Sequence, residues 1–512
     1  MGTGTCKPTS SFGIRAAGDR VNEHAAHGVP GPLARRGQAG VPRRSGASVS
    51  GYHEGVGRLL DSYLSLPPTA PVRLAKRTSN LFRPRAEAAA PGLDVSGLTG
   101  VFSVDPVSRT AEVGGMCTYE DLVRATLPYG LAPLVVPQLK TITLGGAVTG
   151  LGIESTSFRN GLPHESVLEM DILTGAGEIV TAAPDNEHSD LYRGFPNSYG
   201  SLGYATRLRI ELEEVRSTVS LRHVRFRDLG EVITAIGDIV GTGMWGGEPV
   251  DYLDGVVFTA DEAYLTLGRR SDDPGRPSDY TGQQIYYRSI QHDVATPKHD
   301  LLTTHDYLWR WDTDWFWCSR AFGAQNPRIR RLWPRRLLRS SVYWKLIALD
   351  HRWSVSDRLE ARQGQPPRER VIQDVEIPLE RTEEFLRWFL ENIPIEPIWL
   401  CPLRLREQGT AGDGELEAHP WPLYPLRREQ TYVNIGFWST VPGTPGRPGA
   451  ANRRIEEMVD HVGGHKSLYS ESFYDEETFD RLYGGDEVKR LKAIYDPNGR
   501  LLDLYSKAVR RA

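Results

Sequence analysis

Short apolar or alternating runs dominate the first 215 residues of the chain. Those with the length and composition of β-strands are residues 71–76, 99–105, 110–115, 166–175, 178–183 and 205–215. A helical pattern lies among them at residues 117–130, where Thr118 is a suitable N-cap and Gly130 a suitable end. Alternating strands and helices of this size predict an α/β or α+β domain.

The pattern changes after about residue 216. All 12 tryptophans lie at or after Trp245, and strand-like segments at 219–228, 250–260 and 262–270 precede an aromatic cluster at 307–317. An amphipathic helix is predicted at 382–393, where the apolar face consists of Phe385, Leu386, Phe389 and Leu390.

The length of the chain predicts more than one domain. A single hydrophobic core seldom serves 512 residues. We expect a first domain at 49–215, a second at 216–464 and a C-terminal segment at 465–512 that returns to the first. Residues 1–48 mix Gly, Arg, Pro, Ser and His without periodicity. They are interpreted as a disordered extension or as the product of an upstream start codon.

Composition excludes several classes of function. The net charge of −4 argues against a dedicated nucleic-acid binder, which needs a basic face. The four cysteines are scattered and have no histidine at metal-ligand spacing, so we expect reduced thiols in a cytoplasmic protein and no metal site. No apolar run approaches 18 residues, and no secretory signal pattern is present in the chain as given.

The most informative segment is residues 137–159, PQLKTITLGGAVTGLGIESTSFR. Its glycines permit tight turns and close approach, and its hydroxyls and free N–H groups suit phosphate oxygens. A phosphate-bearing cofactor is one interpretation. The other is a Gly-rich β-arch packed against its own core, because no fixed phosphate fingerprint is present.

This segment resembles the central FAD-binding segment of the PCMH/vanillyl-alcohol-oxidase superfamily, and in particular its delta-24 sterol reductase branch, whose members carry a similar GG…GGIES motif. Collinear matches follow at 191–212, 371–380, 395–402, 432–436 and 468–485. The resemblance implies an α+β fold, in which a PCMH-type FAD-binding domain of two subdomains precedes an α+β substrate domain. It also extends to actinobacterial FAD-dependent reductases of 10-methylene fatty acyl chains.

The resemblance assigns cofactor contacts residue by residue. Residues 76–83 match the first pyrophosphate loop, the Gly-rich segment matches the second, and two further segments flank the adenine and close over the flavin. The implied FAD contacts are Thr78, Ser79, Asn80, Pro137, Thr141, Thr143, Gly145, Gly146, Gly150, Gly152, Ile153, Glu154, Ser155, Ser157, Ile179, Val180, Gly200 and Gly203. Backbone N–H groups of the second loop are expected to face the phosphates.

Two departures from common patterns refine the cofactor prediction. The first loop lacks the histidine, and the second the cysteine, through which many relatives attach their flavin, so non-covalent FAD is predicted. No G-x-G-x-x-G followed by a ribose-binding acid is present, which argues against resident NAD(P). The resemblance implies NADPH as a visiting electron donor.

The branch implies reduction of an isolated C=C bond. Such a bond has no carbonyl to accept charge, so the polar route protonates one carbon and delivers hydride from the flavin to the resulting tertiary centre. A 10-methylene fatty acyl chain, carried on a phospholipid and made by a fatty-acyl methyltransferase partner, fits this route. So does a sterol side-chain alkene. An alcohol or sugar oxidase and a flavin-free scaffold remain alternatives.

Such chemistry needs an acid and an apolar pocket that tolerates positive charge. Candidate acids are Glu471, Tyr469, Glu154 and Asp312. Candidate pocket walls are Tyr307, Trp309, Trp311, Trp315 and Trp317, which could equally be core. A basic stretch with Arg330, Arg331, Arg335, Arg336 and Lys345 is either a solvated face or a peripheral contact with the inner face of a membrane.

Overall fold

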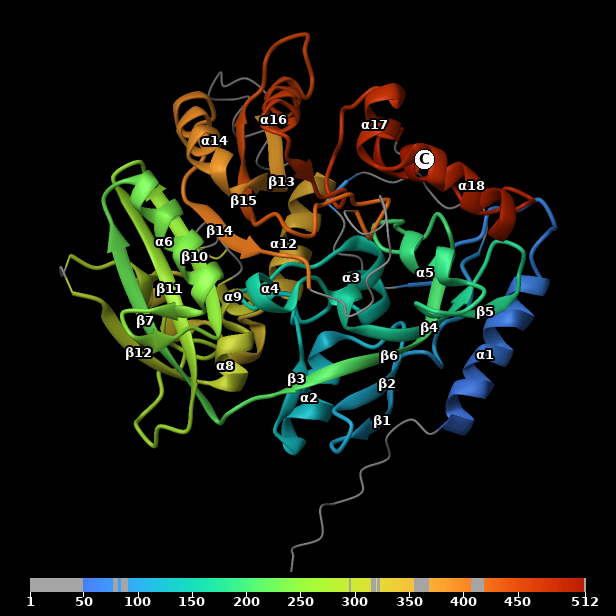
Figure 1. The fold of residues 1–512 in the computed structure, drawn as a ribbon, viewed down its shortest axis with the longest axis horizontal. Helices are drawn as coiled ribbons and strands as arrows, with labels where there is room; N and C mark the ends of the chain where they lie inside the picture. The colour runs from blue at the N-terminus through green and yellow to red at the C-terminus, as the bar shows by residue number, and fades with distance from the viewer. Residues whose placement is uncertain are drawn as a thin grey trace, which may run out of the picture. The chain divides into compact units, whose positions relative to one another are not determined.

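The computed structural model describes residues 49–76, 82–83, 91–293, 296–314, 319, 323–353, 368–406 and 419–510. Two separate sheets organise this part of the chain, one before and one after about residue 216 (Figure 1). Helices accompany both sheets, so the fold class is α+β, as expected.

The smaller sheet is antiparallel and lies in the N-terminal half. Its order is β1-β2-β6-β4-β5, with β3 paired to β6. The strands are β1 (Val101–Asp105), β2 (Thr110–Gly114), β3 (Leu131–Pro133), β4 (Val167–Leu173), β5 (Ile179–Ala182) and β6 (Tyr204–Glu214). The predicted strands at 99–105, 110–115, 166–175, 178–183 and 205–215 are confirmed. The expected strand at 71–76 is not, because only an isolated bridge joins Leu74 to Leu93.

The helices of this half include several short pieces. They are α1 (Val49–Leu64), α2 (Tyr119–Thr126), α3 (Leu144–Gly150), α4 (Ser157–Asn160) and α5 (Ser189–Gly194), with 3₁₀ turns at Leu127–Tyr129 and Pro163–Ser166. Thr118 caps α2 by accepting from the N–H of Asp121, and Gly130 ends the following turn with a φ of 69°, as predicted.

The larger sheet is antiparallel, in the order β12-β7-β11-β10-β14-β15-β13-β16. Its strands are β7 (Thr218–Phe226), β10 (Tyr252–Thr259), β11 (Glu262–Ser271), β12 (Lys298–Thr303), β13 (Arg368–Pro378), β14 (Ile398–Leu403), β15 (Tyr432–Pro442) and β16 (His465–Lys466); β8 (Met244–Trp245) and β9 (Glu248–Pro249) form a separate hairpin. Because β16 pairs with β13, residues 465–466 belong to this sheet.

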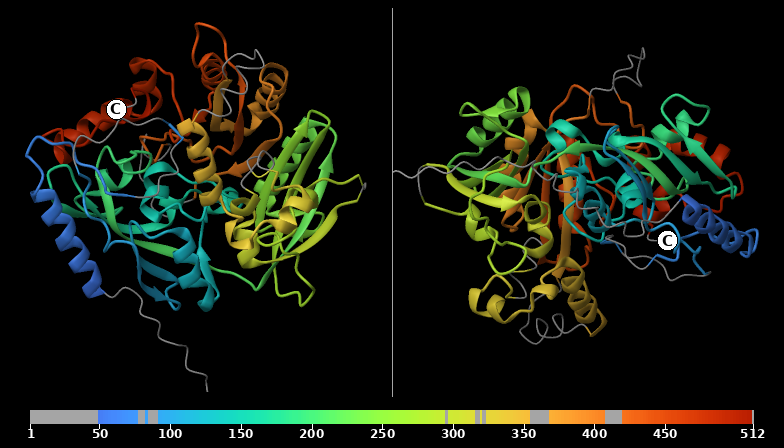
Figure 2. Two further views of the ribbon diagram at one scale, coloured as in Figure 1. Left: turned by 180° about the vertical axis from the view of Figure 1, so that it is seen from behind. Right: turned by 90° about the horizontal axis from the view of Figure 1, so that it is seen from below.

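Helices cover the two faces of the larger sheet differently. α6 (Leu229–Thr242), α14 (Leu379–Asn392) and α16 (Ala450–His461) pack on one face around an aliphatic core. α14 contains the predicted amphipathic helix. The other face is aromatic and contacts α7 (Tyr287–Ile290), α8 (Thr304–Leu308), α9 (Arg310–Asp314) and α12 (Ser340–Trp353). Figure 2 shows this second group on the side of the sheet opposite α6.

The aromatic face also contacts the smaller domain. Leu139, Ile142 and Ile153, all from the Gly-rich segment, pack into the same core as Trp399, Trp438 and Tyr307. The period of two in each strand therefore sends one set of side chains to the aliphatic core and the other toward the Gly-rich segment.

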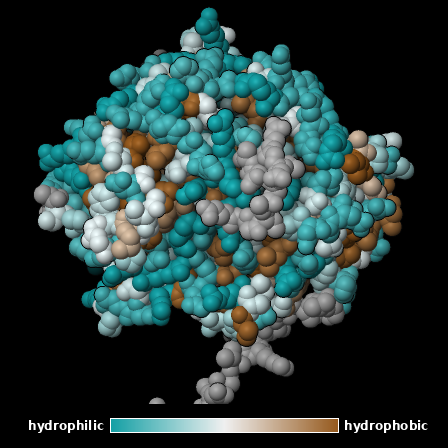
Figure 3. All heavy atoms as spheres, viewed as in Figure 1, coloured by the Kyte–Doolittle hydropathy of each residue, from teal (hydrophilic) through white to brown (hydrophobic). Residues whose placement is uncertain are grey.

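The C-terminal helices pack on the first half of the chain. α17 (Glu476–Leu482), α18 (Gly485–Tyr495) and α19 (Leu504–Ala508) share a core with the smaller sheet. Lys492 donates to the carbonyl of Ser201 over 3.3 Å, and Arg490 pairs with Asp190 over 3.2 Å. The face in Figure 3 is mostly hydrophilic, with brown atoms in separate patches.

Candidate functional site

The Gly-rich segment forms a turn and a short helix, not a β-arch. Thr143 caps α3 and accepts from the N–H of Gly146 over 3.2 Å. The ammonium of Lys76 donates to the same Thr143 hydroxyl over 2.7 Å. A cation at the start of the first predicted loop is therefore fixed against the second loop.

Two adjacent positions in this turn are occupied by glycine for different structural reasons. A Cβ on Gly145 would lie 2.7 Å from the carbonyl oxygen of Gly115, so this glycine permits close backbone packing. A Cβ on Gly146 would lie 2.8 Å from the Thr143 hydroxyl and 3.5 Å from Nζ of Lys76. The N–H of Gly145 donates to Gly115, and that of Gly146 to Thr143. These two N–H groups are used inside the protein, contrary to the expectation that they face a phosphate.

A second cationic group lies where the C-terminal helix meets the segment around residue 200. Lys507 of α19 is partly buried and donates to the carbonyls of Tyr199 (3.1 Å) and Gly200 (2.7 Å). Desolvation, together with the charges of Arg83 and Lys492, lowers the pKa of Lys507 to about 7. The guanidinium of Arg83 stands 5.0 Å from the ring centroid of Tyr199.

This arrangement fits a bound anion. Lys507 is partly buried and Arg83 is buried, and their positive charges repel each other. A pyrophosphate is the group that would relieve that repulsion. Thr78, Ser79 and Asn80 of the predicted first loop lie outside the described residues. Two cations of the same loop are described, and each is fixed by a hydrogen bond: Lys76 donates to Thr143, and Arg83 to the carbonyl of Leu468.

The backbone around Gly200 is unusual. Asn197, Tyr199, Gly200 and Gly203 all have positive φ, at 61°, 48°, 76° and 139°. Tyr199 also donates its hydroxyl to the carbonyl of Gly150 over 2.8 Å, which joins this segment to the end of α3. Non-glycine residues in this conformation persist where surrounding contacts enforce them, and they gather at binding sites.

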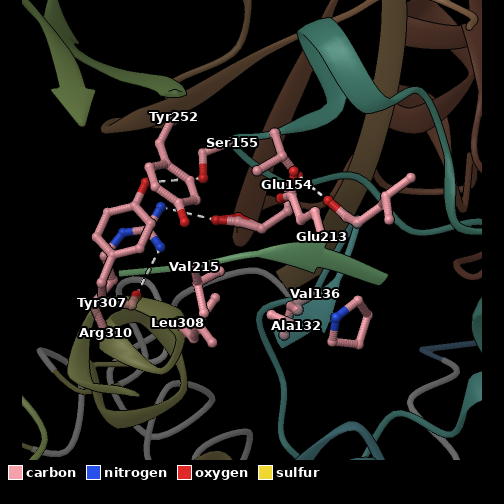
Figure 4. Close-up of a pocket in the computed structure, with 13 residues that line it drawn as sticks. Ala132, Val136, Glu154, Ser155, Glu213, Val215, Tyr252, Tyr307, Leu308 and Arg310 are labelled. Carbon is pink, nitrogen blue, oxygen red and sulfur yellow. Dashed lines mark hydrogen bonds and ion pairs between the residues drawn. The ribbon is translucent and has the colours of Figure 1, made fainter. Parts of the chain in front are cut away.

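Glu154 belongs to a buried charge cluster. Its carboxylate accepts from Arg310 over 2.8 Å (Figure 4). Arg310 also donates to Asp254 over 3.0 Å. Burial raises the pKa of Glu154 to about 7, while Arg310 lowers it and Asp254 raises it. Two carboxylates share one guanidinium, and a second oxygen of each is buried without a partner. Glu154 therefore depends on Arg310 to remain ionised.

A small pocket with a volume of about 10 Å³, partly open to solvent, adjoins this cluster. Its lining combines the charge cluster with apolar side chains: Ala132, Pro133, Leu134, Val136, Glu154, Ser155, Thr156, Glu213, Val215, Tyr252, Tyr307, Leu308 and Arg310. Tyr307 donates to Ser155 over 2.9 Å and stacks under Arg310, 4.0 Å from its guanidinium. Tyr307 is thus a wall of this pocket.

Four aromatic side chains form a second cluster, which we call the aromatic box: Phe82, Trp344, Trp438 and Tyr469. The ring of Phe82 lies 4.7 Å from that of Trp344, 4.6 Å from that of Trp438 and 5.6 Å from that of Tyr469. The box joins the end of the first predicted loop, α12, β15 and the segment after β16. Faces of aromatic rings are suited to stabilising positive charge.

A buried acid lies behind the box. Asp374 of β13 lies near Tyr469, and Asn434 donates to its carboxylate over 3.3 Å. Burial raises the pKa of Asp374 to about 6, although Tyr469 and Asn434 act to lower it. Its carboxylate lies close to β15 because residue 436 is glycine, where a Cβ would be 2.5 Å from Oδ1.

The structure places the other candidate acids in different settings. Glu471 lies 3.7 Å from Arg370, with a side chain that is 17% exposed. Asp312 is buried and accepts from the N–H of Lys140 (2.9 Å) and the hydroxyl of Ser340 (2.6 Å). It joins the Gly-rich segment to α12, which is a structural role. Trp309 and Trp311 are core residues, and Trp315 and Trp317 lie outside the described residues.

The remaining candidate contacts are dispersed along this region. Gly152 packs between Pro137 and Pro163, and Ser157 accepts from the N–H of Glu154 over 3.1 Å. Ile179 and Val180 lie on β5 and are partly buried. Thr141 precedes α3 and is partly buried.

Sequence reasoning missed Asp374, Lys507 and Arg310. Asp374 had a usable signal, because an acidic residue in the otherwise apolar VIQDVEIP strand is unusual. Lys507 and Arg310 had none, since their significance depends on contacts with residues more than 100 positions away.

Within the part of the chain that the structure describes, no group of three His, Cys, Asp or Glu residues has the geometry of a metal site. A search of the same residues finds no helix with the length and hydropathy needed to cross a bilayer.

Comparison with known proteins gives a consistent result. Residues 70–183 match a family model described as an FAD binding domain. The Delta(24)-sterol reductase of Arabidopsis thaliana is 26% identical over 444 residues, which cover 81% of this chain and 76% of the relative. The Homo sapiens protein of the same name is 24% identical over 434 residues, covering 81% and 77%. Cytokinin dehydrogenase 10 of Oryza sativa subsp. japonica is 30% identical over 218 residues, or 41% of this chain and 39% of that protein.

Proposed function

We propose that this chain, an FAD-dependent oxidoreductase with a PCMH-type flavin domain, reduces an isolated C=C bond of a lipid with NADPH as electron donor. The observation that carries the proposal is the similarity to Delta(24)-sterol reductases across four-fifths of the chain. The aromatic box with its buried acid adds the groups that such a reduction requires.

The flavin is proposed to be held without a covalent bond. Lys76, Arg83 and Lys507 would hold its pyrophosphate, and Ile153 and the segment at Gly200 would line it. Cys117 is the nearest preceding cysteine to the Gly-rich segment, and its thiol is buried and points to the carbonyl of Thr118. Burial raises the pKa of Cys117 to about 12, which makes its thiolate unavailable for attachment.

Tyr469 is the proposed proton donor. Trp438 donates its indole N–H to the Tyr469 hydroxyl over 3.0 Å, which fixes the oxygen inside the box. When Asp374 is protonated, its O–H can donate to the same oxygen and free the tyrosine hydrogen to point at a bound alkene. Tyr469 then passes its proton to one alkene carbon and receives the proton of Asp374.

The reaction balances with one hydride and one proton. When bound, the reduced flavin supplies the hydride, and NADPH restores its electrons. The proton passes from Asp374 through Tyr469 to the substrate, and the resulting carboxylate regains a proton from water. Positive charge on the tertiary carbon is stabilised by the rings of Phe82, Trp344 and Trp438.

We propose a 10-methylene fatty acyl chain as the first substrate and a sterol side-chain alkene as the second. Both place the developing charge on a tertiary carbon. The resemblance to reductases of 10-methylene chains favours the acyl substrate, held on a phospholipid and made by a methyltransferase partner. The named relatives favour the sterol.

An anaerobic two-step experiment tests the function. NADPH should bleach the flavin of the purified protein, and only the true substrate should restore its colour and appear as the saturated product by mass spectrometry. A phospholipid with a 10-methylene chain and desmosterol are compared. Acid precipitation should release the flavin into the supernatant.

Variants assign the proton donor. Tyr469→Phe should retain reduction by NADPH and lose alkene reduction by about a hundredfold or more, the usual contribution of a general acid. Tyr129→Phe, at an exposed position, is the control. Rapid reoxidation by oxygen with peroxide release, and no turnover of either alkene, would instead favour the oxidase alternative. A colourless protein that cannot bind FAD would contradict the function.

A further inference from the structure

A contiguous exposed surface lies between the core helices α9 and α12. It consists of α11 (Pro327–Leu332) and the 3₁₀ turn Arg335–Leu337, and we call it the arginine–leucine face. Its apolar members are Ile329, Leu332 and Leu337, and its cationic members are Arg328, Arg331, Arg335 and Arg336. All seven side chains are exposed.

The apolar members are unusually accessible. Leu332 is 85% exposed, Ile329 42% and Leu337 38%. Elsewhere among the described residues, exposed large apolar side chains occur along the sequence singly or as a pair, at Leu64, Val107, Tyr129, Met244, Ile494 and Leu502. Three within nine residues form a patch, and such patches mark interaction surfaces.

The cationic members are weakly neutralised. Arg335 pairs with Asp279 over 2.6 Å in an exposed setting. The sequence suggested that Arg330 shares this face, but the structure corrects this. Arg330 is fully buried and pairs with Asp314, so it anchors α11 to the protein beneath. The anchor leaves the other arginines and the three apolar side chains directed outward.

We propose that the arginine–leucine face docks this protein on a phospholipid bilayer that contains anionic lipids. Cations beside exposed leucine and isoleucine match an interface of anionic head groups over acyl chains. A nucleic acid would leave the apolar side chains unsatisfied. The proposal does not depend on the proposed function, although the two are compatible.

The position of this face suits delivery of a lipid. The chain passes from Leu337 directly into α12, whose Trp344 stacks on Phe82 of the aromatic box. The start of α12 is tied to the flavin domain by Arg339, which pairs with Glu120 over 2.8 Å. A lipid acyl chain that leaves the bilayer at this face would therefore meet α12, the helix that lines the box.

Sedimentation of the full chain with vesicles tests the docking. Wild type should bind phosphatidylcholine vesicles weakly and vesicles that also contain phosphatidylglycerol strongly. Arg331→Gln combined with Arg336→Gln should lower the partition coefficient about 25-fold, since each charge near an anionic surface contributes about fivefold (~1 kcal/mol). Ile329→Ser combined with Leu332→Ser should also lower binding. Both changes are exposed, and circular dichroism verifies folding.

Matched changes elsewhere are the controls. Val107→Ser, at a site that is 92% exposed, and Arg447→Gln should leave binding unchanged. Equal sedimentation of the paired variants and wild type would overturn the proposal, as would equal binding to neutral and anionic vesicles. So would wild type that binds no vesicle and instead self-associates through this face.

The docking proposal and the proposed function can be disproved independently of each other. If both hold, the paired variants should reduce a detergent-dispersed alkene at the wild-type rate and a vesicle-held alkene more slowly. If wild type reduces neither alkene yet sediments with anionic vesicles, the proposed function is wrong and the docking stands.

Discussion

Trp438 donates its indole N–H to the hydroxyl of Tyr469 over 3.0 Å, and both rings contact Phe82. The indole can only donate, so the tyrosine oxygen must accept from it. The tyrosine hydrogen is then free to point either to Asp374 or into the aromatic box. The protonation state of Asp374 decides between these two directions.

This relationship predicts a pH dependence of alkene reduction. Burial raises the pKa of Asp374 to about 6, so its protonated form prevails below that pH. The rate should be level at lower pH and fall about tenfold per pH unit above about 6, as the acid loses its proton. Pre-steady-state oxidation of the reduced flavin by substrate measures this rate.

The negative charge of Asp374 raises the pKa of its buried neighbours. They are Glu376 on the same strand, Cys401 on β14, Tyr199 and Tyr469. Asp374→Asn should remove the inflection and leave a low, flat rate, while NADPH reduction keeps its own profile. A wild-type rate that stays constant up to pH 8 would contradict the role of Asp374.

Five strands of the smaller sheet and β7, β10 and β11 of the larger one were predictable because each has a local signal. Apolar and polar residues alternate in 205–215 and 262–270 because one face of each strand packs against a core. This pattern can be read without knowing which strands pair with them. The run 71–76 has the same local signal but does not join a sheet. Its backbone instead forms one isolated bridge to Leu93 and a hydrogen bond from Val72 to the carbonyl of Arg500. Propensity alone could not show that.

The site was predictable in part. The Gly-rich motif located the segment, but glycine content could not separate a β-arch from the turn and helix at Thr143. That choice depends on Gly115, whose carbonyl requires a close neighbour without a Cβ. The box and the cations around Lys507 come from distant parts of the chain, which no local pattern reports.

Lys507 predicts that FAD binding takes up a proton. Its pKa is lowered to about 7 in the protein without ligand, where Arg83 and Lys492 repel it and Asp496 and Asp503 oppose that effect. A bound pyrophosphate should raise the pKa again, so affinity should weaken as pH rises above about 7. Calorimetry at pH 8 in two buffers of different ionisation enthalpy measures the proton uptake.

The matched substitution is Lys507→Met, which keeps the apolar stem. It should abolish the proton uptake and weaken FAD binding roughly tenfold or more, because a charge-assisted hydrogen bond contributes about 1.5–3 kcal/mol. Lys489→Met, at an exposed salt bridge, is the control. Unchanged proton uptake in Lys507→Met would exclude this lysine.

Gly145 and Gly57 form a matched pair for the flavin turn. Gly145→Ala places a methyl group 2.7 Å from a backbone oxygen, so α3 must shift, at a cost of about 1–3 kcal/mol and with loss of FAD affinity. Gly57 lies in α1 with nothing within 4 Å of its added Cβ. Gly57→Ala should stabilise by about 0.5–1 kcal/mol. Urea unfolding and FAD fluorescence quenching measure both effects, and equal stability of the two variants would contradict the packing argument.

We predict that replacing Arg310 greatly lowers the stability of the protein, and that the loss arises from unpaired buried charge. It is fully buried and neutralises both Glu154 and Asp254, so Arg310→Met leaves two carboxylates without a counter-ion. Loss of one partner from a buried ion pair costs about 3–5 kcal/mol. Arg387→Met, at an exposed pair with Glu383, should cost no more than about 1 kcal/mol.

Adding Asp254→Asn to Arg310→Met should recover part of the loss, because one buried charge is removed. Thermal unfolding of the four proteins tests this, and a double variant no more stable than Arg310→Met would show that packing, not charge, accounts for the effect.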